Sequence, residues 1–230
     1  SSALGSSAKT LTMAAATVLQ ANADLLTLSN PISMSGAATI NAPSTYTFTL
    51  SGILSGASGS LTINSPISNT GTVILTAANI YGGTTTVSAG TLQVGNGGAT
   101  GSLGSGNVVN NTALVFNSTG NSVVSGVISG AGTFTKLGSG TVALTAANTF
   151  TSGITLNAGT LGIYNNTAAS TSTITAADGT KIIFGRGVTN FANNITLNGS
   201  VTFDLDTMVD YLVVGGGGGG GSWVGGGGGG

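Results

Sequence analysis

The stretch Gly71-Thr72-Val73-Ile74-Leu75-Thr76-Ala77-Ala78-Asn79 returns 69 positions later as Gly140-Thr141-Val142-Ala143-Leu144-Thr145-Ala146-Ala147-Asn148. At the same offset, Ala89-Gly90-Thr91-Leu92 returns as Ala158-Gly159-Thr160-Leu161. Of the 25 positions from Gly71 to Gly95, 13 are identical in the second copy. Internal repetition of this kind is typical of solenoids, in which each repeat buries its apolar face against its neighbours.

The repeat extends upstream with a change of spacing. Ser51-Gly52-Ile53 matches Ser125-Gly126-Val127 at an offset of 74, so the first copy holds five additional residues. We expect these residues in the turn around Asn64–Asn69, because a solenoid accepts insertions in its turns while its strands keep stacking. A fainter echo at Ile32–Ile40 indicates that the pattern begins before Asn41.

Short runs of β-branched and alternating residues lie between Gly and Asn, and they predict strands. Strands of this length are too short for a good sandwich, and the intervening Ala-Gly-Thr and Gly-x-Gly-Thr segments differ from the Asn-Gly turns that hairpins favour. An offset of 69 is about three turns of 20-odd residues in a β-solenoid. The predicted strands are Ala37–Ile40, Tyr46–Leu50, Ser60–Ile63, Thr72–Leu75, Thr84–Val87, Thr91–Val94, Ala113–Phe116, Thr133–Lys136, Thr141–Leu144, Gly153–Leu156, Thr160–Ile163, Lys181–Phe184, Asn194–Leu197 and Ser200–Leu205.

Alternation within these strands predicts which side chains fill the coil. The pairs Val142/Leu144, Ile154/Leu156 and Leu161/Ile163 should point inward and their Thr and Asn neighbours outward. Glycines should form the corners, where a positive φ is needed. The alanine-rich stretch Ala14–Leu26 is a mild helix candidate, but β-branched residues and Asn22 interrupt it.

The composition restricts the function. Only nine of 230 residues carry charge, the net charge is −1, and there is no basic cluster, so we expect no nucleic-acid partner. We also expect no membrane span, because no apolar run reaches the ~18 residues that a crossing needs. The absence of Cys removes disulfides and thiolate metal sites. Without His, Cys or Glu, acid–base chemistry near neutral pH would depend on Asp, Lys or Tyr, so we expect no enzyme and no cofactor.

The most tempting chemical site is formed by Asp204, Asp206 and Asp210. Asp204 and Asp206 share one strand face, opposite Phe203 and Leu205, and such carboxylates can bind Ca²⁺ or act on a sugar. The simpler interpretation is a solvated outer face that discourages edge pairing.

Two lysines are the other charged candidates. We expect Lys136 and Lys181 to be solvated, with Asp178 or a neighbouring chain as a partner of little energetic weight.

The chain ends in a glycine-rich segment, in which 13 of the last 16 residues are Gly. We expect two domains, a solenoid over residues 1–208 and a tail over residues 209–230. The tail is either a flexible linker or a segment that packs against copies of itself, and the second case is favoured. The residues expected to mediate self-association are Tyr211, Leu212, Val213, Val214, Trp223 and Val224.

The segment Gly130–Leu144, followed by Asn148-Thr149-Phe150 and Asn157–Leu161, resembles the autotransporter-associated β-strand repeat of bacterial passenger domains. The resemblance covers Ser125–Tyr164 well and Ser51–Gly95 with drift, since the first copy lacks the Lys of the pattern. It implies a right-handed parallel β-helix exported across the outer membrane. The tail resembles glycine-rich ends of phage tail fibres and environmental surface proteins.

These observations together predict an all-β chain, namely a right-handed parallel β-helix followed by an extended polyglycine tail. We expect a secreted or cell-surface structural subunit that self-associates into a fibre, sheath or filament. The alternative is an adhesin, or a receptor-binding module of a virion tail fibre, that recognises surface glycans through an exposed Ser/Thr/Asn face.

Overall fold

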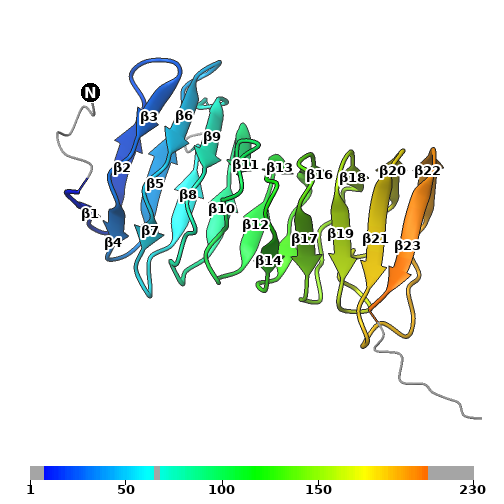
Figure 1. Cartoon of the computed structure of the whole chain (residues 1–230). Helices are drawn as coiled ribbons and strands as arrows, with labels where there is room; N and C mark the ends of the chain where they lie inside the picture. The colour runs from blue at the N-terminus through cyan, green and yellow to red at the C-terminus, as the bar shows by residue number, and fades with distance from the viewer. Residues whose placement is uncertain (1–7, 65–67, 207–230) are drawn as a thin grey trace, which may run out of the picture.

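The chain folds into a coil of short strands that stack along one axis (Figure 1). The computed structural model describes residues 8–64 and 68–206. Within these ranges there are 23 strands and no helix, and every strand pairing is parallel. The predicted parallel β-solenoid is therefore confirmed, while the glycine-rich tail lies outside the described residues.

The strands form four parallel sheets, of which the nine-stranded sheet runs along nearly the whole coil from the blue end in Figure 1 to the orange end. The three-stranded sheet contains β1 (Leu11–Met13), β4 (Ile32–Met34) and β7 (Leu54–Ser55). The six-stranded sheet contains β2 (Thr17–Gln20), β5 (Ala38–Asn41), β8 (Leu61–Ile63), β10 (Thr85–Val87), β12 (Val108–Asn110) and β15 (Ile128–Ser129). The nine-stranded sheet contains β3 (Leu26–Leu28), β6 (Thr47–Leu50), β9 (Thr72–Leu75), β11 (Thr91–Val94), β13 (Ala113–Phe116), β16 (Thr133–Lys136), β18 (Ile154–Leu156), β20 (Ile174–Ala177) and β22 (Ile195–Asn198). The five-stranded sheet contains β14 (Ser122–Val124), β17 (Thr141–Leu144), β19 (Thr160–Ile163), β21 (Thr180–Phe184) and β23 (Val201–Leu205).

Alternation along the strands fills the interior of the coil as predicted. Val142 and Leu144 of β17 are fully buried, and so are Leu156, Leu161 and Ile163. The outward neighbours Thr141 and Ala143 on β17 are only partly covered, whereas the outward Gly162 on β19 is buried. Inward residues of successive turns lie directly above one another, so a single apolar cluster runs through the described coil.

The helix candidate at Ala14–Leu26 is not a helix. It contains β2 and the first residue of β3, with a turn between them. The β-branched pair Thr17-Val18 fits an extended strand better than a helix, and β2 gains four register pairs with β5. The strands before residue 37 and the short strands β7, β12, β14, β15 and β20 were not predicted, except for the echo at Ile32–Ile40.

The two sequence copies lie on different faces of the coil. Three complete turns of the nine-stranded sheet lead from Thr72 through Thr91 and Ala113 to Thr133. The remaining eight residues carry the chain to Thr141, which begins β17 in the five-stranded sheet. The offset of 69 is thus three turns plus one face, rather than three turns alone.

Glycine forms the same corner in both copies. Gly90 has a φ of 61° and Gly159 a φ of 73°, a region that side chains disfavour. A Cβ on Gly159 would also lie 2.5 Å from the carbonyl oxygen of Gly138 in the preceding turn. Eight residues separate β8 from β9 and four separate β16 from β17, so four of the five additional residues fall in the predicted turn, in which residues 65–67 lie outside the described ranges.

Candidate functional site

Two equivalent asparagines, Asn79 and Asn148, each form hydrogen bonds to the turn before and to the turn after their own. Asn79 Oδ1 accepts a hydrogen bond from the amide of Leu54 at 2.8 Å, and its Nδ2 donates to the carbonyl of Ser102 at 2.8 Å. Asn148 accepts from the amide of Ile128 at 2.7 Å and donates to the carbonyl of Ala168 at 2.6 Å. Both side chains are buried, so each satisfies backbone groups that water cannot reach.

At a second corner of the coil, the backbone carbonyl accepts a hydrogen bond from a different kind of side chain in each copy. The carbonyl of Ala89 accepts from Nδ2 of Asn64 at 3.2 Å. The equivalent carbonyl of Ala158 accepts from Nζ of Lys136 at 3.3 Å, and Lys136 also donates to Gly138. An amide in one copy and an ammonium in the other therefore reach the same corner carbonyl.

Lys136 is buried, and the expectation of a solvated lysine was wrong. It lies in an inward row between Phe116 and Leu156, and its side chain is fully covered. Burial lowers the pKa of Lys136 from its ordinary value of 10.5 to about 8, because the charged form loses hydration. The alternation in Thr133–Lys136 indicates this burial, since Lys136 lies on the same strand face as the inward Phe134.

The outer surface of the nine-stranded sheet carries threonine rows without charge. Its outward residues include Thr135, Thr155, Thr175 and Thr196, which are register neighbours on successive strands. No outward side chain of the nine strands described for this sheet is ionisable. This face can form hydrogen bonds and apolar contacts but offers no charge for selecting an ionic partner.

The predicted carboxylate site is divided in the structure. Asp204 Oδ2 forms an ion pair with Lys181 Nζ at 2.6 Å, and Asp206 is exposed on the same strand face. The hydrogen bond and charge of Lys181 lower the pKa of Asp204. Asp210 lies outside the described residues, and within those residues no three His, Cys, Asp or Glu side chains gather. A calcium site therefore stays a prediction.

Asp178, one of the two alternative partners expected for Lys181, has a local structural role. Its Oδ1 accepts a hydrogen bond from the amide of Ser200 at 2.7 Å in the next turn. The partner of Lys181 could not be chosen from the sequence, because the choice depends on the register of β21 against β23, which places Asp204 opposite Ile183.

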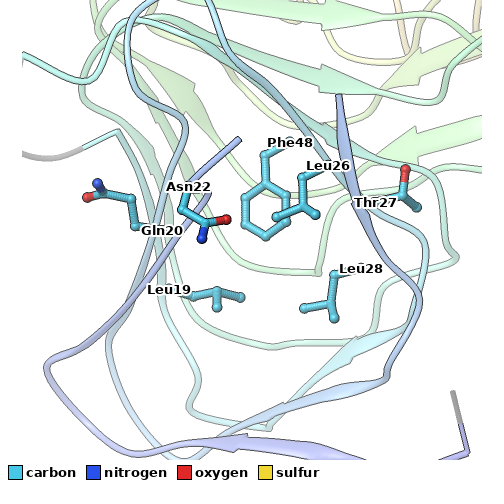
Figure 2. A pocket seen from close by; sticks show the side chains of 7 residues that line it. All are labelled: Leu19, Gln20, Asn22, Leu26, Thr27, Leu28 and Phe48. Carbon is cyan, nitrogen blue, oxygen red and sulfur yellow. The ribbon is translucent and has the colours of Figure 1, made fainter. Parts of the chain in front are cut away.

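A hollow of about 200 Å³ marks the N-terminal end of the apolar column. Figure 2 shows Leu19, Leu26, Leu28 and Phe48 gathered inside the first turns, with Gln20 and Thr27 pointing away. None of the lining side chains is ionisable, so the hollow has no group for acid–base catalysis.

The opposite end of the described coil is also apolar. Phe203 is 47% exposed and Leu205 is 65% exposed, although they align with the inward residues Ile182 and Phe184. The rings of Phe203 and Phe184 are stacked with centroids 6.3 Å apart. The predicted self-association residues Tyr211, Leu212, Val213, Val214, Trp223 and Val224 lie outside the described residues.

The fold and these sites define a class of protein, a repetitive parallel β-solenoid held by apolar rows and buried corner asparagines. Among the described residues there is no helix long and apolar enough to cross a membrane.

Comparison with known proteins identifies the type of repeat in two segments of the chain. Residues 68–94 and 134–163 match the family described as Passenger-associated-transport-repeat. A stretch of 57 residues is 56% identical to the protein named Adhesin BmaC autotransporter from Brucella suis biovar 1 (strain 1330). This stretch covers 25% of the chain and 2% of that relative. No solved structure matches the chain.

These matches confirm the predicted resemblance to autotransporter passenger repeats, on the segments predicted as the best copies. Neither match is to a virion tail fibre, so the comparisons give that alternative no support. The resemblance of the glycine-rich tail to other surface proteins stays a prediction.

Proposed function

We propose that this chain is a segment of the passenger rod of a bacterial surface adhesin of the autotransporter type. The observation that carries the proposal is the repeat itself, which matches passenger repeats in two segments and forms one continuous coil with the turns between them. In this function the chain acts by shape and by binding, not by catalysis. The location that follows is the cell surface or the secreted fraction.

The physical properties of the coil suit this function. Each turn pairs with the turn before it, so folding can propagate along the axis once one turn has formed. The absence of Cys means that no disulfide can lock the chain before it is exported. The buried asparagines and the apolar rows replace such covalent bonds in the folded rod.

Surface display tests the proposal. The chain is fused to an autotransporter translocator in a non-adherent bacterial strain, and adherence to cultured epithelial cells is counted. We expect protease-resistant display and adherence well above that of bacteria with the translocator alone. Equal adherence at equal surface density would show that the chain has no adhesive function.

A second candidate function is self-association into a fibre, sheath or filament. The uncharged outer face of the nine-stranded sheet favours it, because two copies can approach there without electrostatic repulsion. The residues predicted for self-association, including Tyr211 and Trp223, belong to a different segment and lie outside the described residues. Electron microscopy of the purified chain should show regular filaments; dispersed single particles at high concentration would rule this function out.

A further inference from the structure

Charge is concentrated at one place on the outer surface. Of the eight charged residues in the described ranges, Lys181, Arg186, Asp204 and Asp206 lie on or directly after β21 and β23. With Asp178, which lies as close to β21 in the chain as Arg186 does, they comprise two cations and three anions, so the formal charge of this region is −1. Lys181 and Asp204 form the ion pair, and Arg186 and Asp206 are exposed.

A tyrosine ring lies against two glycines of the same sheet. Tyr164 follows β19 and is partly exposed. A Cβ on Gly162 would lie 2.7 Å from Cε2 of Tyr164, and a Cβ on Gly185 would lie 2.9 Å from Cε1. Atoms on opposite edges of the ring thus lie against the two glycines, whose lack of a Cβ leaves room for the ring.

The register places the carboxylates beside this ring. Gly162, Ile183 and Asp204 follow one another in one outward row across β19, β21 and β23. The amide of Gly185 bonds the carbonyl of Ile163, and that of Asp206 bonds the carbonyl of Phe184, so Tyr164, Gly185 and Asp206 form the next row. With strands about 4.8 Å apart, the backbone of Asp206 lies roughly 10 Å from that of Tyr164.

On the β14 and β17 side, the outward row of Gly162 consists of small apolar side chains. Val123 and Ala143 precede Gly162 in the same outward row on β14 and β17. Val123 is 63% exposed, which is high for a valine in a sheet. The row of Gly162 is thus apolar on the β17 side, the row of Tyr164 continues there to the exposed Thr145, and the carboxylates lie on the opposite side.

We propose that this patch, formed by Tyr164, Ile183, Asp204 and Asp206, binds an uncharged hexopyranose unit of a surface glycan. The partly exposed ring accepts the C–H face of the sugar, and the carboxylates accept hydrogen bonds from its hydroxyl groups. A flat apolar surface with a few placed polar groups is the usual composition of such a site. The local formal charge of −1 disfavours an anionic sugar. The inference deepens the proposed adhesive function and rests on it.

Saturation-transfer NMR on the full chain tests the patch with maltohexaose, cellohexaose and chitohexaose, and with sialyllactose as the anionic comparison. We expect at least one neutral oligosaccharide to bind and sialyllactose not to bind. Tyr164→Ala should weaken binding about tenfold, a factor equal to about 1.4 kcal/mol. Tyr164→Phe should keep the affinity within about threefold, because the ring face remains. Asp206→Asn should weaken binding because it removes the charge from the acceptor.

Two controls separate binding from structure. Tyr164→Leu covers the two glycines without an aromatic face, so it should fold like the natural chain and still lose binding. Thr175→Ala, on the nine-stranded sheet, should change neither property. Binding that survives both Tyr164→Ala and Tyr164→Leu, binding of sialyllactose in preference to the neutral sugars, or no binding of any sugar would each overturn the proposal. Adherence of displayed bacteria that is unchanged by Tyr164→Ala would overturn the patch and leave the adhesive function standing.

Discussion

The two sequence copies adopt the same local structure on different faces of the coil. β9 of the first copy belongs to the nine-stranded sheet, and β17 of the second belongs to the five-stranded sheet. Both are followed by a buried asparagine, Asn79 or Asn148, that bonds the turns on either side. The repeat therefore specifies a strand–corner–strand unit, and the number of residues between the copies sets the face on which the unit lies.

The copies differ at the corner where Ala89 and Ala158 are equivalent. Asn64 supplies a neutral donor to the first corner, whereas Lys136 supplies an ammonium to the second. The interior thus accepts chemically different donors at one position, as long as the corner carbonyl is bonded. The second copy carries the cost of a buried charge that the first copy avoids.

The largest effect should come from a charge placed in the apolar column. Leu75→Asp and Leu144→Asp replace equivalent, fully buried side chains, and each should destabilise the coil by several kcal/mol. Ala143→Asp, on the outer face of the same strand, is the matched control and should cost little. Urea unfolding followed by circular dichroism measures all three. A response in one copy alone would break the equivalence of the two copies.

The corner asparagines should give the next largest effect. Asn79→Ala and Asn148→Ala each leave a strand amide and a carbonyl of the next turn without a partner, at a cost of about 2–4 kcal/mol. Asn96→Ala changes an exposed asparagine and should be nearly neutral. Thermal unfolding measures the three variants. If Asn148→Ala behaved like Asn96→Ala, the asparagine would not be a structural element of the repeat.

Lys136 should make the stability of the chain depend on pH. Its folded pKa of about 8 lies below the ordinary 10.5, so the unfolded chain binds more protons between these values. Stability should therefore rise with pH above about 8, by at most about 1.4 kcal/mol per pH unit. Lys136→Met, which keeps the volume but not the charge, should remove this rise.

The measurement should stay below pH 10.0, the ordinary value for tyrosine, because burial raises the pKa of Tyr81 and this has the opposite effect at higher pH. The same pH slope in the natural chain and in Lys136→Met would contradict the buried ammonium.

The smallest effect should come from the exposed ion pair. Asp204→Asn removes the partner of Lys181, and because both side chains are solvated the change in stability should be near the limit of detection. The lowered pKa of Asp204 means that its contribution is present above the ordinary value of 3.8 and is lost as the pH falls through the folded value. A large loss of stability at neutral pH would show that this outer face is not solvated.

Much of the fold follows from local sequence pattern. The bounds of Thr72–Leu75, Thr91–Val94, Thr141–Leu144 and Thr160–Ile163 were predicted as observed, because β-branched residues alternate there between clear corners. The face of each copy was not predictable. Turns differ in length by a few residues, so an offset of 69 does not distinguish three turns from three turns plus one face.

The candidate sites were harder to predict than the strands. Composition alone favours a solvated Lys136. Only its spacing of two residues from the inward Phe134 on the same strand indicates that Lys136 points into the coil. The ion pair of Lys181 with Asp204 depends on a register between β21 and β23 that no local pattern sets. The position of the Tyr164 ring depends on Gly162 and on Gly185. Gly185 follows Tyr164 by 21 residues in the chain but lies next to it in space.

Disulfide formation tests the placement of the two copies most directly, because the natural chain has no Cys. Val115 and Thr135 are outward register neighbours on β13 and β16, so Val115→Cys with Thr135→Cys places two Cα atoms about 4.8 Å apart, within reach of a disulfide. Val115→Cys with Ala143→Cys places them on different sheets. After mild oxidation, mass spectrometry should find the first pair linked and the second pair free. A linked second pair with a free first pair would contradict the account.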